Sequence, residues 1–346
     1  MNSQGKGDFA SSDGRVSLAH GNGGRRMRQL IEELFVRHLG NALLDTDADA
    51  AALPPLPTGA TPMITTDGFT VDPLEFPGGN IGSLAVHGTV NDLAVSGAEP
   101  LYLTLNCFLE EGLDLGLLDR LTASMAAAAT EAGVKVVAGD TKVVRRGEGG
   151  GVYLATSGVG LRRAGLDLGL GRIAAGDHIL VSGPVGDHGT AVLLARGQFG
   201  LRGDLVSDSA SVLPVTRALV DVPGLRFMRD PTRGGLATVA HEIVRHTGMG
   251  IRLSEPAIPI RDQVRAVCEM LGYNPLYLAS EGRVVAVVDP ASAPAALAAM
   301  RGPGQSPDAV EIGTVGCEEP YVVLETEIGG ERLIEELEAD PLPRIC

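Results

Sequence analysis

The chain has 346 residues, and at about 150 residues per domain this length predicts two domains. With 28 basic and 43 acidic residues the net charge is −15, which argues against nucleic acid and anionic membranes as partners. The sequence has no apolar run of the roughly 18 residues that a membrane span needs, and its polar N-terminus lacks the apolar core of a secretory signal. Four scattered cysteines without a CxxC pair indicate neither a disulfide framework nor a structural zinc site, so we expect a cytoplasmic protein.

In the first half of the chain, a helix is followed by alternating strands and helices. Residues 1–24 are polar and glycine-rich, and we expect them to form a flexible leader. Residues 45–61 are rich in Asp, Ala and Pro, as is typical of a loop. Apolar spacing predicts a helix over 27–39, a strand over 62–66, a helix from 78–80 to about 95, a strand over 101–108, a helix over 115–132, and strands over 134–138 and 153–161.

In the second half, a glycine-rich stretch over 163–177 marks the predicted domain boundary. The elements expected beyond it are a strand over 178–182, a helix over 189–196, a strand over 226–228, a helix over 236–246, a strand over 251–253, a helix over 263–271, a strand over 284–288 and a final strand pair over 310–315 and 321–324. We therefore predict an α+β protein of two α/β lobes, an N-terminal domain over 25–165 and a C-terminal domain over 170–330. Residues 331–346 should form a mobile C-terminal tail that carries Cys346, with a helical patch followed by a proline-rich stretch.

Aspartates at the ends of predicted elements are the first candidates for chemistry. Asp67 and Asp140 follow predicted strands, Asp230 precedes a predicted helix, and Asp92 lies among apolar residues within a helix. A single aspartate of this kind is usually an N-cap or a turn former, but a buried carboxylate such as Asp92 needs a partner. Mg²⁺ prefers carboxylates together with substrate phosphates, so the spacing suggests a nucleotide–Mg²⁺ site.

A glycine loop before a predicted helix is a second candidate. Gly78, Gly79 and Asn80 directly precede the helix that ends near residue 95, and free amides there could receive phosphate oxygens. The alternative is an ordinary helix cap in a tight turn. The sequence contains neither the GxxxxGK[ST] loop nor a GxGxxG motif after a strand, which argues against a P-loop protein and a dinucleotide fold.

The last residue of the sequence, Cys346, is the sharpest single feature. It follows a proline-rich tail, so its thiol could act as a tethered nucleophile or carrier, although most cysteines in such a place are simply part of a loose end. Cys107, Cys268 and Cys317 lie in apolar or strand contexts and are expected to be inert core residues. His87 shares the predicted helix of Asp92 and is a candidate to line the same cleft.

Taken together, these segments resemble the HypE family of hydrogenase maturation factors. The resemblance covers about residues 14–346, and its first-lobe motifs are shared more loosely with ATP-binding enzymes of aminoimidazole ribonucleotide, selenophosphate and thiamine phosphate chemistry. The most specific motif is the terminal Pro-Arg-Ile-Cys. The segments that carry the resemblance are Thr65-Thr66-Asp67, residues 76–82, residues 88–94, Gly139-Asp140-Thr141-Lys142, Asp187-His188-Gly189, residues 230–235 and residues 343–346.

The resemblance implies both a fold and an activity. The fold would be aminoimidazole-ribonucleotide-synthetase-like, with the first-lobe sheets of two subunits pairing in a homodimer. HypF would place a carbamoyl group on Cys346, and ATP-dependent dehydration would turn the thiocarboxamide into a thiocyanate. The cyanide would then pass to iron held by a HypC–HypD complex, as a ligand of the [NiFe]-hydrogenase centre.

The same resemblance assigns roles to particular residues. Asp67, Asp92, Asp140 and Asp230 match positions that hold Mg²⁺ and the nucleotide, together with the glycine loop 78–80 and residues 139–141. Lys142 and Glu281 are the candidate bases that remove the amide protons. Lys142 could instead only bind phosphate, and Glu281 could be a turn carboxylate before a strand.

Three other functions remain as alternatives. A selenophosphate synthetase would be expected to carry a reactive cysteine near its N-terminus, and the first cysteine here is Cys107. A small-molecule kinase gives Cys346 no role. A non-catalytic carrier or scaffold would use Cys346 to bind metal, but one thiol without a neighbouring Cys or His is a poor metal site. Failure to bind nucleotide would favour the scaffold.

Overall fold

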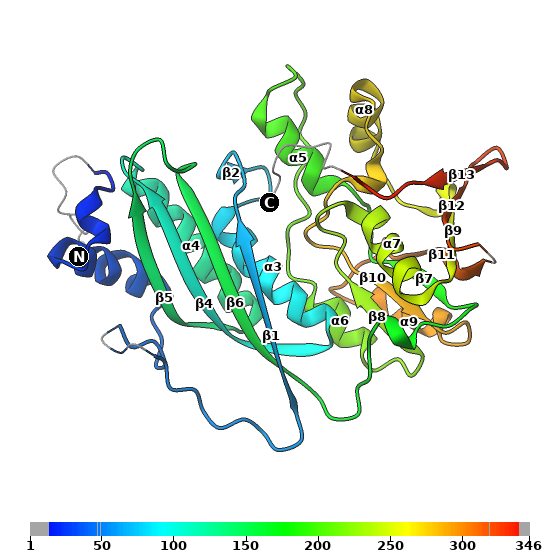
Figure 1. Cartoon of the computed structure of the whole chain (residues 1–346), viewed down its shortest axis with the longest axis horizontal. Coiled ribbons are helices and arrows are strands. Elements are labelled where there is room, and N and C mark those ends of the chain that lie inside the picture. Colours follow the sequence, from blue (N-terminus) through cyan, green and yellow to red (C-terminus); the bar gives the residue numbers. More distant parts are fainter. Residues whose placement is uncertain (1–13, 47, 49, 318, 339–346) are drawn as a thin grey trace.

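The computed structural model describes residues 14–46, 48, 50–317 and 319–338, and within them the predicted α+β organisation of two α/β lobes is confirmed. Each lobe is built on its own sheet, of four strands in the N-terminal domain and seven in the C-terminal domain (Figure 1). In this part of the chain no helix combines the length and the apolar composition that crossing a membrane requires.

The N-terminal domain is a four-stranded sheet, in the order β1-β6-β4-β5, with helices α3 and α4 on one face (Figure 1). Alternate residues of β4, such as Leu103 and Leu105, face these helices and are buried, whereas Asn106 and Phe108 lie on the open face and are exposed. The elements are β1 (Thr61–Phe69), β2 (Glu75–Phe76), β3 (Gly79–Asn80), α3 (Ile81–Val95), β4 (Ala98–Glu110), α4 (Leu115–Ala132), β5 (Lys135–Val144) and β6 (Val152–Arg162). Asp67 and Asp140 therefore lie within strands, where the sequence placed them after strands.

The N-terminal segment packs on β5 and α4 as a short 3-10 turn followed by one continuous helical stretch. It comprises η1 (Leu18–Gly21), α1 (Arg25–Leu30), η2 (Ile31–Val36, a π-helical turn) and α2 (Arg37–Leu39), in agreement with the helix predicted over 27–39. The expected flexible leader does not extend to residue 24. Val16 is 2% exposed, its amide donates to the Leu113 carbonyl at 2.8 Å, and its carbonyl accepts from the Gly112 amide at 2.8 Å. An apolar residue buried against a loop fixes this segment from residue 14 onwards.

The C-terminal domain is a seven-stranded sheet covered by helices on both faces. Within β10, Val285 and Val287 belong to the core beneath α7, whereas Ala286 and Val288 belong to the core that includes α5, α6, α8 and α9. The strand order is β13-β12-β9-β11-β7-β10-β8. The elements are η3 (Leu170–Arg172), β7 (His178–Val181), α5 (Asp187–Arg196), α6 (Leu213–Leu219), β8 (Leu225–Arg229), α7 (Gly235–Thr247), β9 (Gly250–Ser254), η4 (Glu255–Ala257), α8 (Asp262–Leu271), η5 (Pro275–Tyr277), β10 (Val285–Val288), α9 (Ala293–Met300), β11 (Val310–Cys317), β12 (Val322–Glu325) and β13 (Glu331–Ile334).

Two expectations about the end of this domain are wrong. The strands predicted as a final pair, β11 and β12, are not neighbours, because β9 lies between them and pairs with both. Residues 331–334, expected to begin a helical patch, form β13, which pairs antiparallel with β12. The partner strand decides the conformation of so short a segment, because four residues are too few to form a stable helix by themselves.

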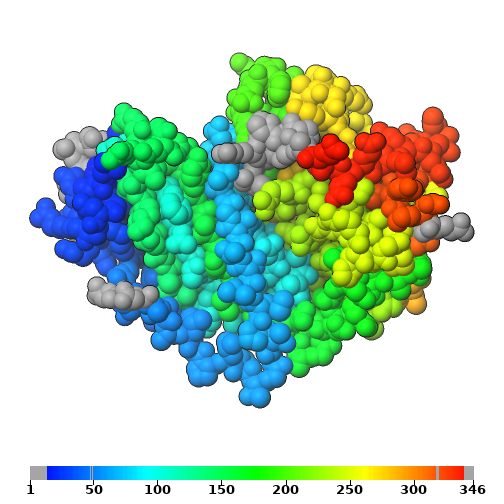
Figure 2. Space-filling view, in the orientation of Figure 1, coloured from blue at the N-terminus to red at the C-terminus, as the bar shows by residue number. Residues whose placement is uncertain are grey.

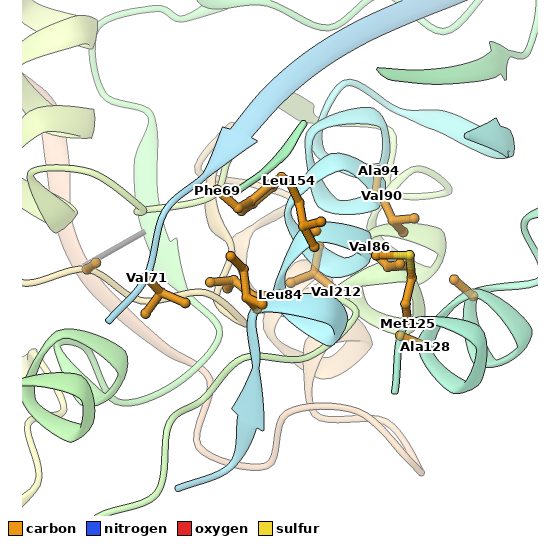
Figure 3. Close-up of a cluster of buried hydrophobic side chains, with 14 of the residues drawn as sticks. Phe69, Val71, Leu84, Val86, Val90, Ala94, Met125, Ala128, Leu154 and Val212 are labelled. Carbon is orange, nitrogen blue, oxygen red and sulfur yellow. The ribbon is translucent and has the colours of Figure 1, made fainter. Parts of the chain in front are cut away.

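Helix α3 joins the two domains through a shared core. It is buried on nearly all sides, as expected of a helix that is apolar all round. Figure 3 shows its Leu84 and Val90 among Leu154 of β6, Met125 of α4 and Val212 of the C-terminal domain. Because one continuous core contains residues of both domains, the position of α3, and of Asp92 on it, is fixed relative to the C-terminal domain.

Candidate active site

A cavity of about 480 Å³ lies between the two domains and gathers four carboxylates. Asp67 comes from β1, Asp92 from α3, Asp230 from the turn after β8, and Glu281 from the loop before β10. Figure 2 shows the blue β1 strand at the surface beside the yellow-green α7 of the other domain. The structure thus brings together three of the four predicted aspartates and one of the two predicted bases.

The N-terminal domain places Asp67 and Asp92 on adjacent elements. Asp67 lies opposite Thr156 of β6, and its carboxylate accepts a hydrogen bond from the Gly68 amide at 2.8 Å. The Thr65 hydroxyl donates to Asp92 Oδ2 at 2.8 Å, which ties α3 to β1. Gly88, one turn before Asp92, allows this close packing, since a Cβ there would come within 2.7 Å of the Phe69 ring.

The C-terminal domain places Asp230 and Glu281 on two loops that are bonded to each other. The Ser280 amide donates to the Pro231 carbonyl at 3.0 Å, so the two loops run side by side. Gly235, at the start of α7, has a φ of +60°, and a Cβ there would lie 2.5 Å from the Leu276 carbonyl oxygen. Only glycine fits this turn, and the turn orients the segment that follows Asp230.

The buried Asn91 of α3 connects the N-terminal side of the cavity to the C-terminal domain through hydrogen bonds. The Asn91 side-chain amide donates to the carbonyls of Glu281 and Ala210, at 3.1 and 3.0 Å, and its oxygen accepts from the Val212 amide at 2.9 Å. Asn91 was not among the predicted site residues, although its place beside Asp92 in an apolar helix is the same signal that singled out Asp92. A buried amide needs partners just as a buried carboxylate does.

Burial and mutual repulsion disfavour the charged forms of three carboxylates in the cavity, Asp92, Asp230 and Glu281. Burial, together with the charge of Asp92, raises the pKa of Asp230 to about 7. Burial raises the pKa of Glu281 well above its usual range, and the charges of Asp230 and Asp208 raise it further. Burial also raises the pKa of Asp92, an effect that the hydrogen bond from Thr65 partly offsets. A cation entering the cavity would relieve this repulsion.

The donor set fits a magnesium–nucleotide complex better than a metal held by protein alone. Among the residues that the structure describes, no three His, Cys, Asp or Glu side chains are arranged to hold an ion together. Mg²⁺ typically uses one or two carboxylates and completes its shell with waters and phosphate oxygens. Arg233 lies at the same cavity, with its Nη2 3.7 Å from Asp67 Oδ1, and adds a cation for a phosphate group.

Asp140 and Lys142 lie elsewhere. They occupy β5, at the edge of the sheet opposite β1. Lys142 Nζ is 3.2 Å from Asp140 Oδ2, and the two side chains are 59% and 50% exposed. Gly139 and Thr141, with Asp140, line a second cavity of about 150 Å³ beneath the N-terminal helix. Within one chain these residues do not meet the carboxylate cluster.

The glycine loop before α3 has a structural explanation. Asn80 caps the helix, since its side-chain oxygen accepts from the amides of Gly82 and Ser83 at 2.9 and 3.1 Å. Gly78 has a φ of +97° and lies against the backbone of Ser207, whose amide donates to the Pro77 carbonyl at 2.8 Å. The geometry thus favours the capping alternative, in which Gly78 and Gly79 form the turn before the helix.

His87 is buried on α3 and is not among the residues that line the 480 Å³ cavity. Burial lowers its pKa, and Glu131 on α4 partly opposes this, so the ring is neutral at physiological pH. Cys107 and Cys268 are buried thiols whose pKa values are raised by burial to about 12 and about 11, as expected of inert core cysteines. Cys346 lies outside the described residues.

Comparison with known proteins assigns the family. The model of AIR synthase related proteins matches twice, its N-terminal domain over residues 47–162 and its C-terminal domain over residues 174–324. The carbamoyl dehydratase HypE of Azotobacter vinelandii is 49% identical over 336 residues, which cover 96% of this chain and 98% of the relative. This chain belongs to the HypE family. Its resemblance to that family therefore rests on nearly the whole length of both proteins.

Solved HypE structures share the fold. A HypE crystal structure in complex with ATP is 44% identical, with a TM-score of 0.90 over 96% of this chain and all of that one. A chain in a crystal structure of a HypE–HypF complex is 41% identical, with a TM-score of 0.78 over 89% of this chain and 99% of that one. The aminoimidazole-ribonucleotide-synthetase-like fold expected of a HypE protein is confirmed.

Proposed function

We propose that this protein performs the reaction for which its HypE relatives are named and supplies the cyanide ligand of [NiFe]-hydrogenase iron. It is an ATP-dependent carbamoyl dehydratase. The observation that carries this assignment is the interdomain cavity, where Asp67, Asp92, Asp230 and Glu281 meet Arg233. Near full-length identity of 49% to a carbamoyl dehydratase supports it.

The chemistry balances with ATP as the dehydrating agent. The carbamoyl group on Cys346 is a thiocarboxamide, whose oxygen is a poor leaving group. Transfer of the γ-phosphoryl group of ATP to that oxygen gives ADP and makes phosphate the leaving group. Loss of the two amide protons and departure of phosphate, which carries the oxygen away, leave a thiocyanate on the Cys346 sulfur.

Asp67, Asp92 and Asp230 are the residues that hold the nucleotide and its magnesium. When bound, Mg²⁺ would neutralise charge on the phosphates during phosphoryl transfer. The raised pKa values of Asp92 and Asp230 support this role, because crowded buried carboxylates release their protons more readily once a cation is present. Arg233 provides a further positive charge at the phosphates.

Glu281 is the base that takes the amide protons. It is 3% exposed and lines the cavity, so water does not compete for its carboxylate. A carboxyl group whose pKa lies well above its usual range is a stronger base once it is ionised. Its loop is held by the Asn91 side chain and by Asp208, whose Oδ1 accepts from the Glu281 amide at 3.1 Å.

In a homodimer, Asp140 and Lys142 of one copy contribute to the nucleotide site of the other. Both residues lie on the open face of the four-stranded sheet, on which Ile64 of β1 and Phe108 of β4 are 78% and 39% exposed. A second copy covering this face would bury these apolar groups. With a two-fold axis parallel to the strands, β5 of one copy lies over β1 of the other, so that Lys142 approaches the phosphates bound by its partner.

HypF is the partner that loads Cys346, and a HypC–HypD complex carrying iron is the acceptor of the cyanide. A solved HypE–HypF complex that contains a chain of this fold supports the interaction with HypF. The strongly acidic surface, with a net charge of −15, fits protein partners rather than nucleic acid.

The test is the mass of the C-terminal peptide. The protein is carbamoylated by HypF, freed of nucleotide, and then incubated with ATP–Mg²⁺. The expected result is a carbamoyl adduct on Cys346 that loses one water only when ATP is present. An adduct that never loses water would mean that the protein carries the carbamoyl group without dehydrating it. An unmodified Cys346 beside active HypF would overturn the assignment, and Cys346→Ala, which should still bind nucleotide, is the control.

A further inference from the structure

The chain between β13 and residue 338 is held against the C-terminal domain. At the end of β13, the Ile334 carbonyl lies 3.0 Å from His241 Nε2 of α7, and Tyr277 Oη donates to the carbonyl of the next residue, Glu335, at 2.6 Å. Arg245 of α7 forms an ion pair with Glu336 at 2.7 Å. The prediction of a tail that moves from residue 331 onwards therefore does not hold for residues 331–336.

Two of these contacts are made to the backbone. His241 and Tyr277 bond to carbonyl oxygens, so they fix the path of the chain whatever side chains the segment carries. Tyr277 itself is partly buried against the core beneath α7, which limits the positions its hydroxyl can reach. A rigid donor on a backbone carbonyl is a strong constraint on position.

The held segment ends at the wall of the carboxylate cavity. A Cβ on Gly234 would lie 3.5 Å from the Leu337 side chain, and Gly234 directly follows Arg233, which lines the cavity. The loop that carries Tyr277 also packs on this turn, since a Cβ on Gly235 would lie 2.9 Å from the Tyr277 carbonyl carbon. Tyr277 and Glu281 are four residues apart on that loop.

We propose that Tyr277 and His241 are positioning residues that clamp the chain at Ile334–Glu335, so that the arm carrying Cys346 begins at the cavity wall. The inference rests on the proposed function and adds a reason for the arm's length. Nine residues of the sequence, 338–346, follow Leu337, and a chain of nine residues spans at most about 30–32 Å when extended. If residues 335–337 were released, the tether would start directly after β13 and have twelve residues.

Tether length sets how often the carbamoyl group meets the bound nucleotide. The effective concentration of a tethered group falls at about the −3/2 power of tether length, so lengthening from nine to twelve residues lowers it about 1.5-fold. The clamp also sets the direction in which the arm leaves. We therefore expect Tyr277→Phe to slow dehydration by about two- to five-fold, and to leave nucleotide affinity and carbamoylation by HypF unchanged.

The experiment compares dehydration of the tethered group with dehydration of a free one. In cis, the carbamoylated full-length protein receives ATP–Mg²⁺ and its loss of water is followed in a single turnover. In trans, a Cys346→Ala chain receives a saturating carbamoylated peptide of residues 339–346. Tyr277→Phe should be slower in cis and equal to the parent chain in trans. Tyr321→Phe, an exposed tyrosine between β11 and β12, is the matched control.

Hydrogen exchange provides a readout that does not depend on activity. The amides of β13, which pairs with β12 directly before the clamped residue Glu335, should exchange faster in Tyr277→Phe, whereas those of β9 should not change. An equal loss of rate in cis and in trans would overturn the proposal, because Tyr277 would then act on the site itself. Faster exchange without any loss in cis would also overturn it. Absence of dehydration by the unaltered protein would instead contradict the proposed function, and the exchange result would still report on the clamp.

Discussion

Two sets of acidic residues that the sequence does not distinguish lie in different surroundings. Asp230 and Glu281 line the interdomain cavity, whereas Asp140 lies on β5. Asp230 and Glu281 are 5% and 3% exposed, between two domains; burial raises the pKa of both, and the charge of Asp230 raises the pKa of Glu281 further. Asp140 is about half exposed on β5 and paired with Lys142 at 3.2 Å. Ionising the buried pair costs free energy unless a cation is bound, whereas solvent and Lys142 stabilise the charge of Asp140.

This contrast separates a site that one chain builds from residues that become a site only with a partner. Burial between domains makes the carboxylate cluster reactive in a single chain, because a low dielectric strengthens every charge interaction. The β5 pair has no such environment in one chain. It would acquire one only when a second copy covers the open face of the sheet.

The largest expected effect is the loss of the buried base. Glu281→Gln should reduce the rate of water loss from carbamoylated Cys346 by about 10²- to 10⁴-fold, because general base catalysis contributes about that much. Nucleotide binding, measured by calorimetry, should persist. Glu327→Gln, at an exposed position, is the matched control. Near-normal dehydration by Glu281→Gln would contradict this role and would indicate Lys142 as the base.

The second prediction tests whether the β5 pair acts across a dimer. Lys142→Met should lower dehydration about 10- to 100-fold by removing a charge from the phosphates. Mixed with Glu281→Gln after subunit exchange, it should restore about a quarter of the normal rate, because half of the dimers then hold one intact site. No recovery, with exchange demonstrated by mass spectrometry, would place Lys142 and Glu281 in the same chain's site or in none.

The third prediction concerns stability and pH. Because the pKa of Asp230 rises from 3.8 to about 7 on folding, its ionisation lowers the free energy of unfolding as the pH rises from about 4 to about 7, and this loss is complete above pH 7. Asp230→Asn should therefore increase the free energy of unfolding at pH 8 by on the order of 2–4 kcal/mol. The gain should shrink as the pH falls towards 4, where the folded protein keeps this proton. Denaturant unfolding at several pH values without nucleotide checks it, and a gain independent of pH would contradict the electrostatic cause.

The smallest expected effect is the counterpart on β5. Asp140→Asn removes one partner of an exposed ion pair, and such pairs contribute roughly 0–1 kcal/mol. Unfolding of this variant should match the parent chain within about 1 kcal/mol at both pH 5 and pH 8. A pH-dependent change as large as that of Asp230→Asn would remove the distinction between the two groups.

Local patterns predicted most of the secondary structure. The helix over 115–132 was predicted to the residue, because Asp114 caps its start and Gly133, with a φ of +74°, ends it. Helices α6 and α9 were not predicted, since both are short and their stability comes from the core that they share. The order of the strands depends on contacts between distant segments, which periodicity does not contain.

For the site, the sequence by itself singled out the chemistry-bearing residues and, through the resemblance, the family. It identified Asp67, Asp92, Asp230 and Glu281 as candidates, but treated Asp140, Lys142 and His87 in the same way. Only the tertiary structure decided which of them share a cavity and which lie apart. The reason is that composition and spacing fix which groups can carry charge, whereas burial between domains decides which charges meet and how strongly they interact.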